Sequence, residues 1–459
     1  MLDEQIIKRE TLAVVTMTSF MTPFMSSSVT VALSALCNDL SLNAKVLSWV
    51  ATANLLASAV FLVPFGRIAD IKGRKKIYLN GIGIFTIASL LLGLSPNAFW
   101  LILYRIMQGI GGAMIFGTGI ALLASVYEVD ERGKALGINA AAVYTGLSLG
   151  PFLGGFLTEH LGWRSVFFAN VFFGLIAIVI VLIKLKKEWI ANPDDKIDYI
   201  GSAIYGITLI CLIYGFSIII KRDGLYIFLI GVLAGFLFIK WEVKAISPLV
   251  NINLFKDNRA FTYSNLAALI NYSATFNVTF LLSIFIQYIK GISPGRTGII
   301  LLVQPLTMAI FSPFSGWLSD KIEPRIVSSI GMLLSGIALA ALSFINLNTS
   351  IQYFVFVLIL LGLGLALFAS PNTNAVMSSV KKNYYGLAAN MLGSMRIVGQ
   401  TISMAIAILI ISFFLGNLKT SPLNYALLIK SAHVSFIFFS LLCIPGLFAS
   451  INRGKISNN

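Results

Sequence analysis

Two arginines stand inside long apolar segments, where a charged side chain is unusual. Arg105 lies in the segment 98–124, and Arg396 lies about ten residues, or roughly 15 Å of helix, into the segment 386–415. An arginine in hydrocarbon is costly and almost always faces a cavity or a polar partner. Each can therefore line a cavity as a cation or anchor one helix to the backbone carbonyl groups of another.

The residues that catalysis uses are not grouped in this sequence. The chain has two histidines, His160 and His433, far apart, and no pair of acids lies well inside an apolar segment. The phosphate-binding pattern G-x-x-x-x-G-K-[ST] is absent, which disfavours an ATP-driven pump. The three cysteines have no spacing typical of a disulfide framework or a zinc site. We therefore expect no enzyme, no metal site and no cofactor.

The elements that carry these residues follow from composition. Of 459 residues, 58% are hydrophobic and 11% are charged, against about 25% charged in soluble domains. A membrane-spanning helix needs about 20 apolar residues, and the ten-residue alternation of a membrane barrel is absent. The fold class predicted is an all-α polytopic membrane protein with fourteen transmembrane helices. They are expected at 12–36, 47–66, 77–95, 98–124, 135–158, 164–183, 198–220, 224–241, 260–289, 296–318, 326–345, 351–376, 386–415 and 432–450.

The positive charges predict the orientation. With the N-terminus inside, 23 of the 33 Lys and Arg residues fall in inner loops and tails, and 8 fall in outer loops. Membrane proteins keep such an excess on the cytoplasmic side. We expect a multi-pass protein of the cell membrane with both termini cytoplasmic. The net charge of +15 does not indicate a nucleic-acid partner, because no compact soluble domain carries it.

A repeated loop predicts the domain organisation. The segment GRIADIKGRKK (66–76) follows the second expected helix, and GWLSDKIEPR (316–325) follows the tenth. Parallel repeats about an axis along the membrane normal occur in a large class of secondary transporters. We expect two six-helix bundles, 1–187 and 259–459, joined by a linker and two inserted helices in 188–258. The inserted pair has few polar residues and is expected at the lipid-facing periphery.

Small residues are concentrated in the fifth expected helix. Glycines at four-residue spacing let a neighbouring backbone approach closely, and a proline bends a helix. The pattern predicts a pivot, and an ordinary small-residue interface is a compatible interpretation. The residues concerned are Gly146, Gly150, Pro151, Gly154 and Gly155.

Together these motifs resemble the major facilitator superfamily, and more narrowly its fourteen-helix drug:proton antiporter branch. The resemblance rests on the loop 66–76, on LYRIMQGIGGAM with Arg105 and Gln108, on GLSLGPFLGG (146–155) and on GLAANMLGSMRIVGQ (386–400). It covers nearly the whole chain. It implies a secondary transporter that exports small amphipathic compounds by proton antiport and alternating access.

The resemblance also implies roles for individual residues. Asp70 and Arg74, with Gly66 and Gly73, are expected to gate the inner side, although a charge cluster that only enforces topology would look the same. Asp320 and Arg325 form the weaker counterpart, because Glu323 and Pro324 replace the expected glycine and basic residue. The residues expected in gating are Gly66, Asp70, Gly73, Arg74, Asp320 and Arg325, and those expected in the cavity or in coupling are Arg105, Gln108, Arg396 and Glu159.

The proton carrier is not evident from the sequence. Many members of the resembling branch have an aspartate in the first helix, where this chain has Met25. Arginine does not release its proton at physiological pH and cannot be the carrier by itself. The candidates are Asp70 and Glu159, with Arg105 modulating the field. A looser scheme, in which substrate and proton affect one another indirectly, is the alternative.

The charges also predict the substrate class. A cavity with two cations and no buried carboxylate disfavours a permanently cationic compound. We expect neutral, zwitterionic or anionic amphiphiles, carried by a monomer in the lipid bilayer with protons as partners. An importer or lipid flippase for an anionic or lipid-like substrate is the alternative within transporters.

The cavity itself is expected to use apolar and weakly polar groups. Met17, Met21 and Met25 recur at four-residue spacing, and methionine adapts to varied ligand shapes, although such a stripe is often plain packing. Polar groups in lipid need partners, and some are expected to line the cavity. The candidate substrate-binding residues are Met21, Met25, Asn271, Tyr272, Gln304 and Asn374.

Overall fold

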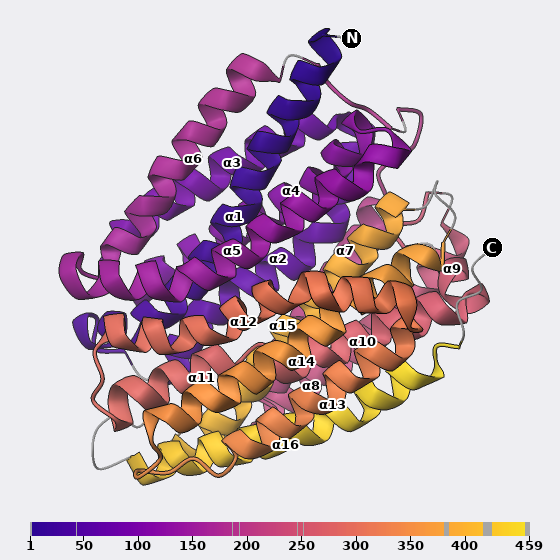
Figure 1. Ribbon diagram of the computed structural model, residues 1–459. Coiled ribbons are helices and arrows are strands. Elements are labelled where there is room, and N and C mark those ends of the chain that lie inside the picture. The colour runs from indigo at the N-terminus through magenta and orange to yellow at the C-terminus, as the bar shows by residue number, and fades with distance from the viewer. Residues whose placement is uncertain are drawn as a thin grey trace. The chain divides into compact units, whose positions relative to one another are not determined.

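The computed structural model describes residues 2–42, 44–185, 187–191, 193–245, 247–250, 252–380, 385–415 and 425–454. Within these ranges the chain forms helices and no strand (Figure 1). The helices are α1 (Leu2–Asp39), α2 (Ala44–Lys72), α3 (Arg74–Gly93), α4 (Ala98–Val126), α5 (Val129–Leu161), α6 (Arg164–Lys184), α7 (Tyr199–Ser217), α8 (Arg222–Lys244), α9 (Ile252–Asp257), α10 (Arg259–Thr275), α11 (Val278–Ile284), the π-helical η1 (Phe285–Ile289), α12 (Pro294–Lys321), α13 (Pro324–Leu342), α14 (Ile351–Ser378), α15 (Tyr385–Leu415) and α16 (Tyr425–Asn452).

The predicted fold class is confirmed. Fourteen helical segments in the described ranges are long and apolar enough to cross a membrane, and each overlaps one of the fourteen expected from the sequence. The first runs over Gln5–Asp39 rather than 12–36, because the helix continues into polar residues where the apolar run has ended. The ninth, Arg259–Ile289, is built from α10, α11 and η1 rather than from one regular helix.

The described chain divides into two compact units. Unit 1 holds residues 1–25, 50–146 and 164–252, and unit 2 holds 26–49, 147–163 and 253–459. The helices α1, α2 and α5 are thus each shared between the units, and the inserted pair α7 and α8 belongs to unit 1. The two superimposable six-helix bundles remain a prediction of the sequence.

Unit 1 is held together by close crossings of helix backbones. A Cβ on Gly111 of α4 would lie 2.6 Å from the backbone nitrogen of Phe85, so glycine allows α3 and α4 to meet. The helices α7 and α8 form a hairpin, and Tyr205 of α7 donates a hydrogen bond of 3.3 Å to the carbonyl oxygen of Ala59 on α2. On α8 most apolar side chains, such as Phe236, are exposed.

Unit 2 contains a buried cation that the sequence placed among the loop charges. Arg453 is 1% exposed and follows the last turn of α16. Its guanidinium donates to neutral groups on four elements: the Ser450 carbonyl and hydroxyl, Ser264 on α10, Asn372 on α14 and Ser328 on α13. Burial lowers the pKa of Arg453 to about 10, so it remains protonated at neutral pH. The residue fastens the end of α16 to three neighbouring helices.

Candidate functional site

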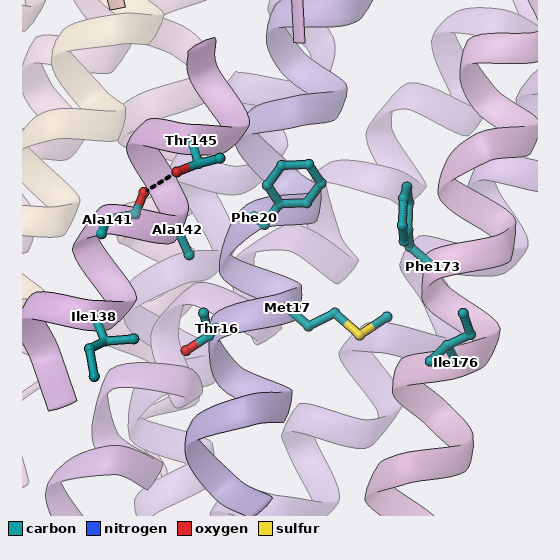
Figure 2. A pocket seen from close by; sticks show the side chains of 9 residues that line it. All are labelled: Thr16, Met17, Phe20, Ile138, Ala141, Ala142, Thr145, Phe173 and Ile176. Carbon is teal, nitrogen blue, oxygen red and sulfur yellow. Dashed lines mark hydrogen bonds between the residues drawn. The ribbon is translucent and has the colours of Figure 1, made fainter. Parts of the chain in front are cut away.

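An apolar pocket opens in unit 1 among α1, α5 and α6. Its volume is about 570 Å³, within the range of small-molecule sites. Figure 2 shows the residues of α1 between those of α5 and α6. The lining residues are Thr16, Met17 and Phe20 of α1, Ile138, Ala141, Ala142 and Thr145 of α5, and Phe173 and Ile176 of α6. None of them is charged.

Two features give the pocket chemical character. The rings of Phe20 and Phe173 meet edge to face with centroids 6.0 Å apart, which provides an aromatic wall. The Thr145 hydroxyl donates to the Ala141 carbonyl oxygen at 2.8 Å (Figure 2). The buried Thr16 hydroxyl oxygen has no hydrogen-bond partner among the described residues. Thr16 is therefore a residue of the pocket lining whose hydroxyl has unused hydrogen-bonding capacity within the described residues.

The methionine stripe reaches the pocket through Met17 alone. Met21 is 0% exposed and Met25 is 1% exposed, and neither lines the pocket. Met25 instead accepts a hydrogen bond of 2.8 Å at its sulfur from Asn170 of α6. In the sequence, Thr16, Met17 and Phe20 lie within about one and a half helical turns of each other, and this spacing puts them on the side of α1 that lines the pocket.

The charged loop between α2 and α3 is ordered by its own residues. Arg74 donates from Nε at 2.8 Å and from Nη2 at 2.6 Å to Asp70 Oδ1. Arg74 Nη1 reaches α4, where it donates to the Ala121 carbonyl oxygen at 2.9 Å and to the Ser125 hydroxyl. The two residues expected to gate the inner side therefore pair directly, and the pair ties the loop to α4. Gly66 lies at another α2–α4 contact, since a Cβ on Gly117 would be 3.4 Å from its nitrogen.

Glu188 also belongs to this cluster, although no motif in the sequence indicates it. Its carboxylate accepts hydrogen bonds from the backbone nitrogens of Lys75 at 2.8 Å and Lys76 at 3.1 Å, at the N-terminus of α3. A helix N-terminus favours a negative charge. Gly73, with φ of 112°, leaves room for it, because a Cβ there would lie 2.6 Å from Glu188 Cδ. Glu188 lies more than 110 residues after Lys75 and Lys76 in the sequence, so no local sequence pattern could reveal the contact.

The second charged loop differs from the first. Arg325 forms an ion pair with Glu323, two residues before it. The side chain of Asp320 lies outside the part of the chain that the structure describes. Glu323, which replaces the glycine expected by resemblance, is thus the observed partner of Arg325.

Arg105 is 2% exposed and forms hydrogen bonds inside unit 1. Its Nε donates to the Val50 carbonyl oxygen on α2 at 2.9 Å, and its Nη1 donates to Gln108 Oε1 at 2.6 Å. Gln108 in turn donates to the Ser89 hydroxyl on α3 at 2.8 Å. The chain of bonds links α2, α3 and α4, which is the geometry of a helix anchor. Arg105 and Gln108, both expected in the cavity or in coupling, therefore contact each other on α4.

Arg396 has a different setting, in unit 2. Its guanidinium carbon lies 6.0 Å from the centre of the Tyr272 ring, a cation–π distance. The helices α15 and α10 cross closely beside it, because a Cβ on Gly399 would lie 2.6 Å from the Leu269 carbonyl oxygen. Arg396 is half-buried. Two of the predicted site residues, one from each helix, therefore meet.

The glycine motif of α5 makes several close contacts. A Cβ on Gly146 would lie 2.4 Å from the Phe20 carbonyl oxygen on α1 in unit 1. In unit 2 a Cβ on Gly154 would lie 2.6 Å from Ser28 Cα, and the Ser28 hydroxyl donates to the Gly150 carbonyl oxygen at 2.9 Å. The boundary between the two units crosses α5 directly after Gly146.

The same part of α5 packs on the first turns of α12 in unit 2. A Cβ on Gly155 would lie 2.5 Å from the Pro294 carbonyl oxygen, and a Cβ on Gly298 would lie 2.1 Å from that of Pro151. Exposed Glu159 accepts a hydrogen bond of 2.8 Å from the Gly295 backbone nitrogen. The Glu159 carboxylate therefore lies at the N-terminus of α12, where the helix dipole favours a negative charge.

The remaining predicted polar residues lie in unit 2 and are held by neighbouring groups. Asn271 is fully buried and donates to the Met332 sulfur at 3.4 Å. Asn374 donates to the Ser319 hydroxyl at 3.2 Å. The carbonyl oxygen of Gln304 would lie 2.5 Å from a Cβ on Gly362, at a crossing of α12 and α14. Asn271 thus lies at a contact of α10 and α13, whereas Asn374 and Gln304 both lie at contacts of α12 and α14.

The described residues thus combine fourteen helical segments that are long and apolar enough to cross a membrane, buried cations in polar networks and an uncharged pocket, which together are typical of an α-helical membrane transporter. The sequence profile of the Major Facilitator Superfamily matches residues 15–262 and 265–455. The chain belongs to this superfamily. It is a multi-pass membrane transporter of a small molecule and not an enzyme, as the sequence predicted.

Similar proteins include transporters with different printed substrates. The riboflavin transporter RibZ of Clostridioides difficile (strain 630) is 28% identical over 439 residues, which cover 94% of each chain. The multidrug transporter protein MdtP of Bacillus subtilis (strain 168) is 28% identical over 391 residues, 82% of this chain and 71% of that protein. A crystal structure of a bacterial homologue of the human lysosomal transporter Spinster, inward-facing and unoccupied, has a TM-score of 0.69 at 15% identity and 97% coverage of each chain. This last likeness concerns the fold alone.

Proposed function

We propose that this transporter exports small, uncharged amphipathic compounds in exchange for protons, by alternating access, with both termini in the cytoplasm. The pocket of α1, α5 and α6 receives the apolar body of the substrate. The Asp70–Arg74 pair acts in the inner gate, and the glycine motif of α5 acts as a pivot.

The uncharged lining of the pocket carries this proposal. A permanently cationic compound would lose its hydration there without gaining a counter-ion, and burying an unpaired charge is costly. An aromatic compound gains contact with Phe20 and Phe173, and one polar group can bond to the Thr16 hydroxyl. The Arg105 guanidinium is already engaged by Val50 and Gln108, so it does not supply an anion site.

The relatives support the same substrate class. One is a riboflavin transporter and another is a multidrug transporter. Riboflavin is uncharged at neutral pH and combines a flat aromatic ring with a polar chain, which is the kind of compound that the pocket fits. Riboflavin is therefore a suitable first substrate for a transport experiment.

The test uses inside-out membrane vesicles from cells that express the chain. With an acidic lumen, we expect the vesicles to accumulate riboflavin and to lose it when a protonophore is added. Ethidium, which is permanently cationic, should accumulate at least several-fold less. Strong ethidium accumulation without riboflavin accumulation would refute the proposed substrate class, and accumulation unaffected by the protonophore would refute proton exchange.

Two threonine variants test whether the pocket takes part. Thr16→Val removes the hydroxyl that has no partner among the described residues, and we expect several-fold weaker riboflavin transport. Thr145→Val is the matched control, because its hydroxyl already donates to the Ala141 carbonyl oxygen. Equal transport by both variants would remove the pocket from the substrate route.

A further inference from the structure

One carboxylate, Glu242, is buried among the acids that the structure describes. It lies two residues before Lys244, the last residue of α8, and is 3% exposed. In the sequence it stands directly after the expected helix 224–241. Glu242 therefore places an ionisable group inside the α7–α8 hairpin, whose other side chains on α8 are mostly apolar and exposed.

The two oxygens of Glu242 have different surroundings. Oε2 accepts a hydrogen bond of 2.9 Å from the Val250 backbone nitrogen, and the Leu249 backbone also interacts with the carboxyl group. Oε1 is buried and has no hydrogen-bond partner among the described residues. An ionised carboxylate with a buried oxygen left unpaired is costly, whereas a protonated one presents an O–H donor on that side.

A second carboxylate lies on the side of the unpaired oxygen. A Cβ on Gly201 of α7 would be 3.0 Å from Glu242 Oε1 and 2.4 Å from Asp198 Oδ2. Both oxygens are thus close to one point, and their separation cannot exceed the sum of those distances. Two carboxylates this close disfavour simultaneous ionisation.

Asp198 has the environment of the charged member of the pair. Its Oδ1 accepts from the Gly201 backbone nitrogen at 2.7 Å as the N-cap of α7, and its Oδ2 accepts from Trp241 Nε1 at 2.8 Å. Glu242 lies at the other kind of helix end, the C-terminus of α8, where the helix dipole is unfavourable for an anion. The proton of the pair therefore belongs to Glu242.

The cations of the neighbouring segments are directed elsewhere. Lys240 of α8 lies 4.6 Å from the centre of the Phe236 ring, and Lys244 is exposed. Before α7, Lys196 is exposed and Asp195 is paired with Arg67 of α2. Asp198 is the charged group that interacts with Glu242 in the described chain.

We propose that Glu242, facing Asp198 at the base of the α7–α8 hairpin, is the proton-binding site of this transporter. On release, the O–H bond of Glu242 breaks and the proton passes to water beside the half-buried Asp198. The carboxylate also holds Val250, whose segment leads directly into α9, so its protonation state acts on the connection between the hairpin and the helices that follow. Only the link to transport rests on the proposed function; proton binding itself does not.

The first experiment measures proton binding on the purified full chain by infrared spectroscopy. We expect the wild type to show the carbonyl band of a protonated carboxylic acid at neutral pH and Glu242→Gln to lack it. The control Asp223→Asn, an exposed acid at the opposite end of α8, should keep the band. Asp198→Asn, which preserves the N-cap, should move the disappearance of the band to lower pH by about one unit, because the like charge is gone. A wild type without the band at neutral pH, or a band unchanged in Glu242→Gln, would overturn the proposal without any use of transport.

The second experiment measures riboflavin uptake into inside-out vesicles against pH. Glu242→Gln should lose the response to the proton gradient, whereas Asp223→Asn should match the wild type. Persistent proton-driven uptake by Glu242→Gln would show that the carrier is elsewhere. A failure of all variants and the wild type to transport would count against the proposed function, whereas the infrared result would still decide whether Glu242 binds a proton.

Discussion

Gly73 has a backbone conformation that L-residues rarely adopt, and the space of a side chain there is taken by Glu188. Gly73→Ala should therefore lower the stability of the folded protein by about 1–3 kcal/mol, the usual size of backbone strain. The measurement is the thermal midpoint of the purified protein in detergent. Gly83→Ala in α3 is the control, since its Cβ would meet nothing within 4 Å. Equal midpoints for the two variants would contradict the contact with Glu188.

Arg105 presents a choice between an anchor and a cavity cation, and its hydrogen bonds favour the anchor. Arg105→Ala leaves Gln108 and the Val50 carbonyl oxygen buried without their partner, so we expect a loss of about 3 kcal/mol and less folded protein in the membrane. Fluorescence-detected size exclusion of extracted membranes measures the folded fraction. Arg222→Ala, at an exposed position of α8, should behave as wild type. A well-folded Arg105→Ala protein that fails to transport would favour the cavity interpretation instead.

For individual side chains, the sequence predicts which residues are important better than it predicts which residues they contact. Asp70 and Arg74 are only four residues apart, so their contact across Gly73, between the end of α2 and the start of α3, is a local one. Glu188, Arg453 and Glu242 appear in the sequence as ordinary loop or end charges, and their burial or capping depends on segments far away along the chain. A local pattern contains no information about such contacts.

Among the elements, the crossing of α5 and α12 is the most constrained contact of the predicted pivot. A Cβ on Gly155 would lie 2.5 Å from a backbone oxygen, which no side-chain rotation can relieve. Gly155→Ala should therefore cost about 1–3 kcal/mol by overpacking and slow transport several-fold. The measurements are the thermal midpoint and the initial rate of riboflavin uptake.

The control for this crossing lies in the same helix. Gly137→Ala adds a Cβ that meets nothing within 4 Å, so it should leave both the thermal midpoint and the uptake rate near wild type. If Gly155→Ala transported at the wild-type rate with an unchanged midpoint, α5 would not depend on this close approach.

The helices themselves could be predicted because a membrane span needs a long apolar run, and that run is visible in the sequence. Within the described residues, each of the fourteen expected spans overlaps a helical segment long and apolar enough to cross a membrane. The change from α10 to α11 and η1 inside one span could not be predicted, because the apolar run continues through it without a proline. The pocket also could not be located, since it depends on which faces of α1, α5 and α6 are adjacent.

For the whole molecule, motifs spread over the chain indicate the family, which agrees with the profile match over residues 15–262 and 265–455. The number of spans follows from the apolar runs, and the described residues contain fourteen helical segments long and apolar enough to cross a membrane. The substrate and the driving force cannot be predicted in the same way, because they depend on small free-energy differences at a few residues. The uncharged pocket favours a neutral amphipathic compound, and Glu242 gives the proton a place to bind.

The most direct test uses the purified chain in proteoliposomes, with a pH gradient as the sole energy source and riboflavin as the compound measured. We predict that riboflavin moves toward the acidic side against its own gradient and that collapse of the pH gradient abolishes the movement. Riboflavin flux that only follows its concentration difference, whatever the pH on either side, would contradict proton-driven export.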